Sequence, residues 1–193
     1  MLLLACVPPG PADSEPAETA APCTPVAAMF FDLGETLVTE QEDGLFANIP
    51  EAIALLDALT ANAMPMGLIT NVLEDDDRDD LAALLVDPSL LDRFDVLLLS
   101  SEAESRPKPN RHIFEEAVNL LADVPPIEQT VFVTEEIGDL ADEDPPSRGA
   151  QAAGMIGVHV SGEAPSDLVD ETVLPADLAS LAAADWVECL EER

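Results

Sequence analysis

The sequence is punctuated by five short, mostly apolar runs, and each ends at or just before a polar residue. They cover residues 26–31, 66–70, 94–100, 130–134 and 155–160. Short apolar runs separated by segments with helical periodicity are typical of parallel strands that are buried on both faces and joined by helical crossovers. The sequence therefore predicts an α/β fold: a doubly wound, mostly parallel five-stranded sheet with helices on both faces.

The segments between these runs are predicted to be helices. The first, residues 48–61, has Pro50 in its first turn and apolar side chains on one face. Residues 74–86 begin with carboxylates, which suit a helix N-terminus. Asn110 is expected to cap a helix that ends near residue 122, and residues 176–190 are expected to form a closing helix.

The charge of the chain restricts its partners. Of 193 residues, 40 are acidic and 7 are basic, which gives a formal net charge of −33. Such a chain repels nucleic-acid phosphates and anionic lipid headgroups, so no nucleic-acid partner is expected. The composition fits a protein from a salty environment, and it fits an acidic protein in ordinary salt equally well.

The N-terminal segment 1–25 is predicted to be a tether that precedes one domain over residues 26–193, because it is rich in Pro, Ala and Glu and has no apolar periodicity. Its start, Leu3-Leu4-Ala5-Cys6, resembles a bacterial lipobox, although only five residues precede Cys6. The protein is therefore either a membrane-tethered lipoprotein with an upstream start, or cytoplasmic with a chance match. Cys6, Cys23 and Cys189 have no CxxC spacing, so neither a zinc site nor a disulfide framework is expected.

Polar residues at the strand ends are expected to converge on one crevice, because the carboxyl ends of parallel strands lie at the same edge of a sheet. These residues are Asp32, Thr70, Glu135 and, by way of the loop after the third run, Lys108. A carboxylate can act as a nucleophile or metal ligand, a hydroxyl and an amine can hold phosphoryl oxygens, and a second carboxylate can complete a magnesium site. The set outlines a phosphoryl-transfer site.

Four segments in this order resemble the motifs of the haloacid dehalogenase (HAD) superfamily of hydrolases. They are MFFDLGETL at 29–37, LITN at 68–71, RPKPNRHIF at 106–114, and VFVTE at 131–135 followed by GAQAAGM at 149–155. The one lysine of the chain, Lys108, falls on the third motif. The resemblance covers residues 26–160, and it implies a Rossmann-like α/β domain.

The resemblance also implies roles for these residues. Asp32 would attack a phosphoryl group to form an aspartyl-phosphate, and Thr70 and Lys108 would bind its oxygens. Mg²⁺ would be held by Asp32, the backbone carbonyl of Gly34 and an acid of the fourth motif, for which Glu135 is the first candidate. The stretch from residue 37 to 69 is predicted to hold a loop, one helix and a strand, so no cap domain is expected. An open crevice suits a phosphorylated small molecule or a phosphoprotein.

Two departures from the motifs leave alternatives open. Phosphatases of the family carry a general acid/base aspartate where this chain has Gly34, and the adjacent Glu35 is a poor substitute because its side chain points elsewhere. One alternative is therefore a weakened relative that binds a phosphorylated ligand or a protein partner without turnover. Carbon–halogen hydrolysis is less favoured, because the family's dehalogenases carry a cap.

The fourth motif departs in a second way, because an acidic run lies between Glu135 and the glycine turn at 149. The run contains Asp139, Asp142, Glu143 and Asp144. Each member is interpreted as part of a solvated loop, with Asp139 or Asp144 as alternatives for a supporting role at the metal. His112 and His159 are interpreted as surface or packing residues.

Overall fold

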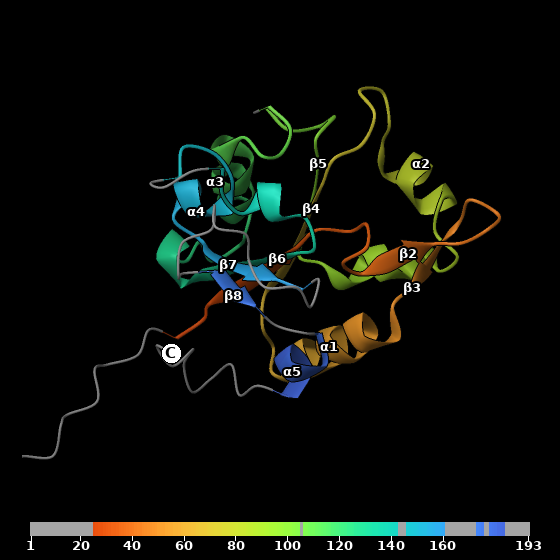
Figure 1. Ribbon diagram of the computed structural model, residues 1–193, viewed down its shortest axis with the longest axis horizontal. Coiled ribbons are helices and arrows are strands. Elements are labelled where there is room, and N and C mark those ends of the chain that lie inside the picture. The colour runs from red at the N-terminus through yellow and green to blue at the C-terminus, as the bar shows by residue number, and fades with distance from the viewer. Residues whose placement is uncertain (1–24, 105, 143–145, 161–172, 176–177, 184–193) are drawn as a thin grey trace, which may run out of the picture.

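The computed structural model describes residues 25–104, 106–142, 146–160, 173–175 and 178–183. Its centre is one parallel sheet of six strands in the order β5-β4-β1-β6-β7-β8 (Figure 1). The strands are β1 (Ala28–Phe31), β4 (Met66–Thr70), β5 (Val96–Leu99), β6 (Thr130–Thr134), β7 (Ile156–His159) and β8 (Val173–Pro175). The five predicted strands are confirmed, each within its predicted run, and β8 adds a short edge strand that the sequence analysis did not predict.

The central strand β1 has a core on each of its faces, because its side chains alternate. Ala28 and Phe30 belong to one apolar cluster, and Met29 and Phe31 belong to the other. All four side chains are fully buried. A strand that is apolar at every position, rather than at every second one, therefore marks the middle of a doubly covered sheet.

Helices cover both faces, as predicted. The face of Met29 is covered by α1 (Pro50–Ala61) and by α5 (Leu178–Ala183), which lie side by side below the sheet in Figure 1. The opposite face is covered by α3 (Arg111–Asn119), next to the single-turn α4 (Ala150–Ala153). Asn110 caps α3 as expected, since its side chain accepts a hydrogen bond from the backbone N–H of His112.

The segment between β1 and β4 contains an antiparallel hairpin where the sequence analysis expected only a loop. Its strands are β2 (Val38–Glu40) and β3 (Phe46–Asn48), and Gly44 makes the turn with a φ of +81°. The run is too short and too polar to stand out as strands by pattern alone. Because α1 is the other element of this segment, the prediction that no cap domain is inserted here agrees with the structure.

The helix expected over residues 74–86 is shorter than predicted. It is α2 (Arg78–Ala83), and its N-cap is Asp77, whose side chain accepts from the backbone N–H groups of Asp79 and Asp80. Asp80 in turn accepts from the N–H of Asp77, which completes a capping box. The carboxylates at 74–76, which were expected to begin the helix, therefore lie outside it. Three 3-10 helices complete the described elements: η1 (Pro88–Arg93), η2 (Ile127–Gln129) and η3 (Ile137–Asp139).

Two predictions fall wholly or partly outside the described residues. The tether with its lipobox-like start lies in residues 1–24, and the closing helix predicted for 176–190 is described only over Leu178–Ala183. Within the described residues, none of the helices has the length and apolar character needed to span a bilayer.

Candidate phosphoryl-transfer site

Two strands at the point where the strand order reverses supply the acids of the site. The chain runs from β1 outward through β4 to β5 and then returns to β6 on the other side of β1. Asp32 follows β1, and Glu135 follows β6. The backbone N–H of Asp32 donates to Val133 in β6, with an N···O distance of 2.9 Å. Ligands of open α/β sheets bind at such a reversal, outside the carboxyl ends of the strands.

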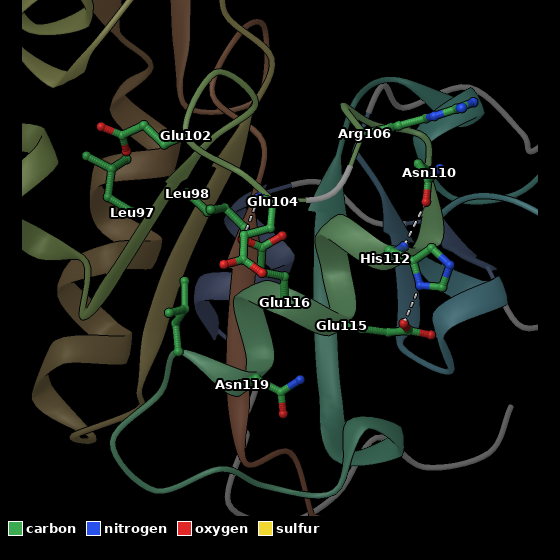
Figure 2. A pocket seen from close by; sticks show the side chains of 11 residues that line it. Leu97, Leu98, Glu102, Glu104, Arg106, Asn110, His112, Glu115, Glu116 and Asn119 are labelled. Atoms are coloured by element: carbon green, nitrogen blue, oxygen red, sulfur yellow. Dashed lines mark hydrogen bonds and ion pairs between the residues drawn. The ribbon is translucent and has the colours of Figure 1, made fainter.

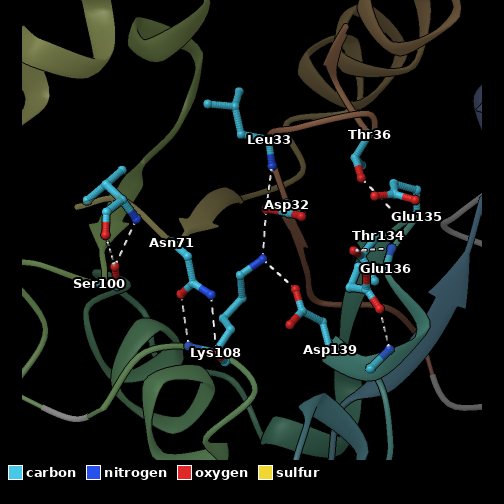
Figure 3. A network of polar contacts seen from close by, with 12 residues as sticks. Asp32, Leu33, Thr36, Asn71, Ser100, Lys108, Thr134, Glu135, Glu136 and Asp139 are labelled. Atoms are coloured by element: carbon cyan, nitrogen blue, oxygen red, sulfur yellow. Dashed lines mark hydrogen bonds and ion pairs between the residues drawn. The ribbon is translucent and has the colours of Figure 1, made fainter. Parts of the chain in front are cut away.

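The amine of Lys108 lies between two carboxylates. Its Nζ is 2.7 Å from Oδ1 of Asp32 and 2.6 Å from Oδ2 of Asp139 (Figure 3). The Lys108 side chain is only 2% exposed, and those of Asp32 and Asp139 are 13% and 9% exposed. The expected approach of Lys108 to Asp32 is therefore present. The site has a buried cation directly beside the predicted nucleophile.

Asn71 fixes the backbone of Lys108. The N–H of Lys108 donates to Oδ1 of Asn71 at 3.0 Å, and Nδ2 of Asn71 donates to the Lys108 carbonyl at 3.1 Å (Figure 3). Lys108 also lies over the ring of Phe132, with Nζ 5.4 Å from the ring centre. The loop after β5 is thus tied to the end of β4. Asn71 belongs to the second motif, and its role in holding Lys108 is visible only in the structure.

Asp139 corrects the interpretation of the acidic run as a solvated loop. It lies in η3, is buried, and pairs with Lys108. Burial raises the pKa of the Asp139 carboxyl, the nearby Lys108 ammonium opposes this, and the negative charges of Asp32 and Glu136 add to the rise. Spacing could not reveal this residue, because only the fold of η3 turns it inward. Asp142 accepts hydrogen bonds within its own loop, and residues 143–145 lie outside the described part of the chain.

Glu135 is held by contacts from two other segments. Its backbone N–H donates to the buried hydroxyl of Thr36 at 3.0 Å, and its carbonyl is 2.8 Å from Nε2 of His159. Burial raises the pKa of the Glu135 carboxyl, and repulsion from Glu136, Asp32 and Glu35 raises it further. His159 is packed, as expected, and it also supports this loop.

Few oxygen ligands for a metal ion are available at the strand ends, and they are Asp32, Glu135 and the backbone carbonyl of Gly34. Glu135 and Asp32 lie close enough to repel each other, and the Gly34 carbonyl belongs to the loop after β1. In the described part of the chain, no three His, Cys, Asp or Glu side chains are grouped to hold a metal ion. A site here would therefore rest on two carboxylates and a carbonyl, which is the kind of partial oxygen set that Mg²⁺ accepts.

Thr70 lies where the strand pattern puts it, at the end of β4 and 6% exposed. Its carbonyl accepts a hydrogen bond from the N–H of Ser100. Thr70 therefore lies at the same edge of the sheet as Asp32, but among the described residues no hydrogen bond joins its side chain to Asp32 or Lys108.

Gly34 and Glu35 begin the turn that leads into the hairpin. A Cβ built on Gly34 would meet no atom within 4 Å, whereas Glu35 adopts a left-handed φ of +50°. The carboxylate of Glu35 accepts from the hydroxyl of Thr39 at 3.0 Å and from the N–H of Glu40 at 3.4 Å. This side chain is therefore bound to the hairpin.

A separate groove of about 990 Å³ lies beside α3 and β5. Its lining includes Leu97, Glu102, Glu104, His112 and Glu116 (Figure 2). His112 is exposed, and its Nδ1 is 2.7 Å from Glu115. The groove includes none of Asp32, Thr70, Lys108, Glu135 or Asp139 in its lining, so it is distinct from the site at the strand ends.

Comparisons with known proteins agree with this architecture. No protein-family model and no curated protein sequence matches the chain. Among solved structures, an L-2-haloacid dehalogenase superposes with a TM-score of 0.62 at 14% identity, covering 83% of this chain and 98% of that one. A HAD-superfamily hydrolase from Ehrlichia chaffeensis gives a TM-score of 0.61 at 14% identity, over 84% and 97% of the two chains.

The protein CbbY from Rhodobacter sphaeroides, in complex with phosphate, gives a TM-score of 0.60 at 14% identity, over 81% of this chain and 96% of that one. At such low identity these similarities bear on the fold. The chain has the fold of the haloacid dehalogenase superfamily of hydrolases, which confirms the fold that the sequence motifs predicted.

Proposed function

We propose that this protein is a capless hydrolase of the phosphatase type, acting on phosphomonoesters with Mg²⁺ through an aspartyl-phosphate on Asp32. The observation that carries the proposal is the 2.7 Å contact between Lys108 Nζ and Asp32 Oδ1 at the strand-order reversal. A buried ammonium at this position stabilises negative charge that develops on a phosphoryl group in transfer.

Each residue of the site has a separate task in this proposal. Asp32 supplies the attacking carboxylate oxygen, and Lys108 and Thr70 bind the phosphoryl oxygens. Asp139 and Asn71 position Lys108, the first through its ammonium and the second through its backbone. The reacting groups are thereby fixed before the substrate arrives, which lowers the cost of reaching the transition state.

Mg²⁺ would be held by Asp32, the carbonyl of Gly34 and Glu135. The fit is supported by the repulsion between the Asp32 and Glu135 carboxylates, because a divalent cation between like charges relieves it. A hard cation with one or two protein carboxylates keeps sites for water and for substrate phosphate. When bound, the ion would neutralise charge on the transferring phosphoryl group.

The substrate would be a phosphorylated small molecule or a phosphoprotein. A phosphorylated ligand is favoured by the similarity to CbbY, whose solved structures hold phosphate and, in an Asp-to-Asn variant, xylulose-1,5-bisphosphate. The segment between β1 and β4 contains a hairpin and α1, and it inserts no cap domain. A site without a cap can accept a large substrate, so the proposal includes a phosphoprotein beside the small molecule.

A second candidate function is binding of a phosphorylated ligand or a protein partner without turnover. It is favoured by Gly34, which stands where phosphatases of the family carry their general acid/base. Loss of such a group typically lowers rates ~10²–10⁴-fold. The two functions share the same binding groups and differ in turnover.

Hydrolysis of p-nitrophenyl phosphate with and without Mg²⁺ tests the proposal. Magnesium-dependent turnover that is abolished in Asp32→Asn supports a phosphatase. Asp43→Asn is the matched control, because Asp43 is an exposed carboxylate in the hairpin turn that contacts only its own loop. Magnesium binding by calorimetry without any turnover would instead favour the binding function.

A further inference from the structure

Position 34 has room for a side chain but carries none. Gly34 lies two residues after Asp32, and a Cβ added to it would have no neighbour within 4 Å. Its φ lies outside the left-handed region, so an ordinary side chain fits the backbone there. The glycine is therefore required neither by the turn nor by packing. Position 34 therefore supplies no proton donor.

The described acids around this space are engaged elsewhere. The Glu35 carboxylate is bound by the Thr39 hydroxyl and the Glu40 N–H in the hairpin. Asp139 pairs with Lys108 at 2.6 Å. Glu135 has the role of a magnesium ligand in the proposed function, and the Glu136 carboxylate accepts from the N–H of Gly138 at 3.1 Å.

The described bases and cations are also engaged. Lys108 donates to two carboxylates, and the ring of His159 contacts the Glu135 carbonyl. His112 lines the separate groove beside α3. Among the described residues, no uncommitted acid therefore remains to protonate a departing oxygen.

From this we infer that the site takes phosphoryl donors whose leaving group departs as a stable anion, with acyl phosphates as the substrate class. The inference rests on the proposed function. An Asp32 carboxylate oxygen attacks phosphorus, and the bond from phosphorus to the leaving oxygen breaks. The electron pair leaves with that oxygen, as a carboxylate that needs no proton. An alkoxide would need one, and among the described side chains around the site none is left to supply it.

The second step needs only water. A water oxygen attacks the phosphorus of the aspartyl-phosphate, and the bond from phosphorus to Asp32 breaks. The electron pair returns to the Asp32 carboxylate, and the water proton passes to solvent. The products are inorganic phosphate and the regenerated site.

The test compares three donors with the full-length protein and Mg²⁺: acetyl phosphate, p-nitrophenyl phosphate and n-propyl phosphate. Their leaving groups are a carboxylate, a stabilised phenolate and an alkoxide. The expected order of kcat/KM follows leaving-group acidity, with the alkyl ester at least ~10²-fold below acetyl phosphate. Phosphate release is measured for each donor, with the uncatalysed rate subtracted.

Variants at position 34 then identify the cause. Gly34→Asp should raise kcat/KM for n-propyl phosphate ~10²-fold, because it places a proton donor in open space. The ratio of kcat/KM on acetyl phosphate to kcat/KM on n-propyl phosphate should therefore fall. In Gly34→Asn the new side chain has the shape of aspartate but no acidic proton. The ratio of kcat/KM on the two donors should therefore equal that of the parent protein.

The outcomes separate this inference from the function on which it depends. Equal rates on n-propyl and acetyl phosphate in the parent would overturn the inference and leave the phosphatase standing. The inference would also be overturned if the ratio of kcat/KM on acetyl phosphate to that on n-propyl phosphate were the same in Gly34→Asp and Gly34→Asn. No turnover of any donor would overturn the proposed function and the inference together.

Discussion

The Lys108 ammonium lies 2.6 Å from the Asp139 carboxylate, and the two side chains are 2% and 9% exposed. A second carboxylate, Asp32, is 2.7 Å from the same nitrogen. One cation therefore holds two carboxylates together in a nearly dry space. Removing a single partner from such an arrangement leaves charge that neither water nor another group compensates.

Replacing Lys108 by Met should therefore cost more stability than a surface change. We expect a loss of about 3 kcal/mol in the free energy of unfolding, because Asp32 and Asp139 then repel each other with no cation between them. Urea denaturation measures the change. Lys108→Met combined with Asp139→Asn should recover part of the loss, since one of the two charges is gone.

The matched control for Lys108→Met is Arg111→Met. Arg111 begins α3 and makes an exposed pair with Glu115 at 3.8 Å, so its loss should change the free energy of unfolding by less than about 0.5 kcal/mol. If Lys108→Met and Arg111→Met had equal midpoints of urea denaturation, the buried cation would not stabilise the folded protein as expected.

The strand ends could be predicted from sequence because each step depends on local pattern. Apolar runs identify strands, parallel order brings their carboxyl ends together, and Asp32 and Lys108 follow from that order. Asp139 could not be found in the same way. Its burial depends on how the turn of η3 is fitted beneath Lys108, and in the sequence it is one acid among several.

The hairpin and the sixth strand escaped prediction for a different reason. β2, β3 and β8 are three residues each, and so short a segment carries too little apolar pattern to identify it. Their strand geometry is set by pairing with neighbours, which is tertiary information. The start of α2 shows the same limit, because several acids precede it and only Asp77 forms the capping box.

Asp139→Asn should change how stability depends on pH. The pKa of Asp139 is raised above its ordinary value of 3.8 by burial, against the opposing effect of Lys108. The folded protein therefore holds this proton to higher pH than the unfolded chain does. Its contribution to stability is complete below pH 3.8 and is lost as the pH rises through the folded-state pKa. The free energy of unfolding of wild type should fall relative to that of the variant across this interval.

Asp87→Asn gives the opposite slope and serves as the control. Hydrogen bonds from the hydroxyl and the N–H of Ser89 lower the pKa of Asp87 below 3.8. Its contribution is present above that pH and is lost as the pH falls through the folded-state pKa. Denaturation of both variants at a series of pH values measures the slopes. A relative slope of the same sign in the two variants would contradict the raised pKa of Asp139.

Asn71→Ala should weaken the site through the backbone of Lys108. The substitution removes two hydrogen bonds, so we expect a loss of about 1–3 kcal/mol in the free energy of unfolding and a lower kcat/KM on p-nitrophenyl phosphate. Asn62→Ala is the control, because the Asn62 amide is exposed and donates only to Ala58 within its own helix end. Unchanged activity in Asn71→Ala would show that Lys108 keeps its position without these two hydrogen bonds.

Gly67→Ala tests the packing beneath the site, and Gly34→Ala is its control. A Cβ on Gly67 in β4 would lie 2.3 Å from a ring carbon of Phe30, which is fully buried in the neighbouring strand and cannot move without shifting β1. Overpacking of this kind costs about 1–3 kcal/mol. A Cβ on Gly34 meets nothing within 4 Å, so that variant should unfold at the wild-type urea concentration. Equal urea midpoints for the two variants would mean that β1 and β4 are less tightly packed than the structure has them.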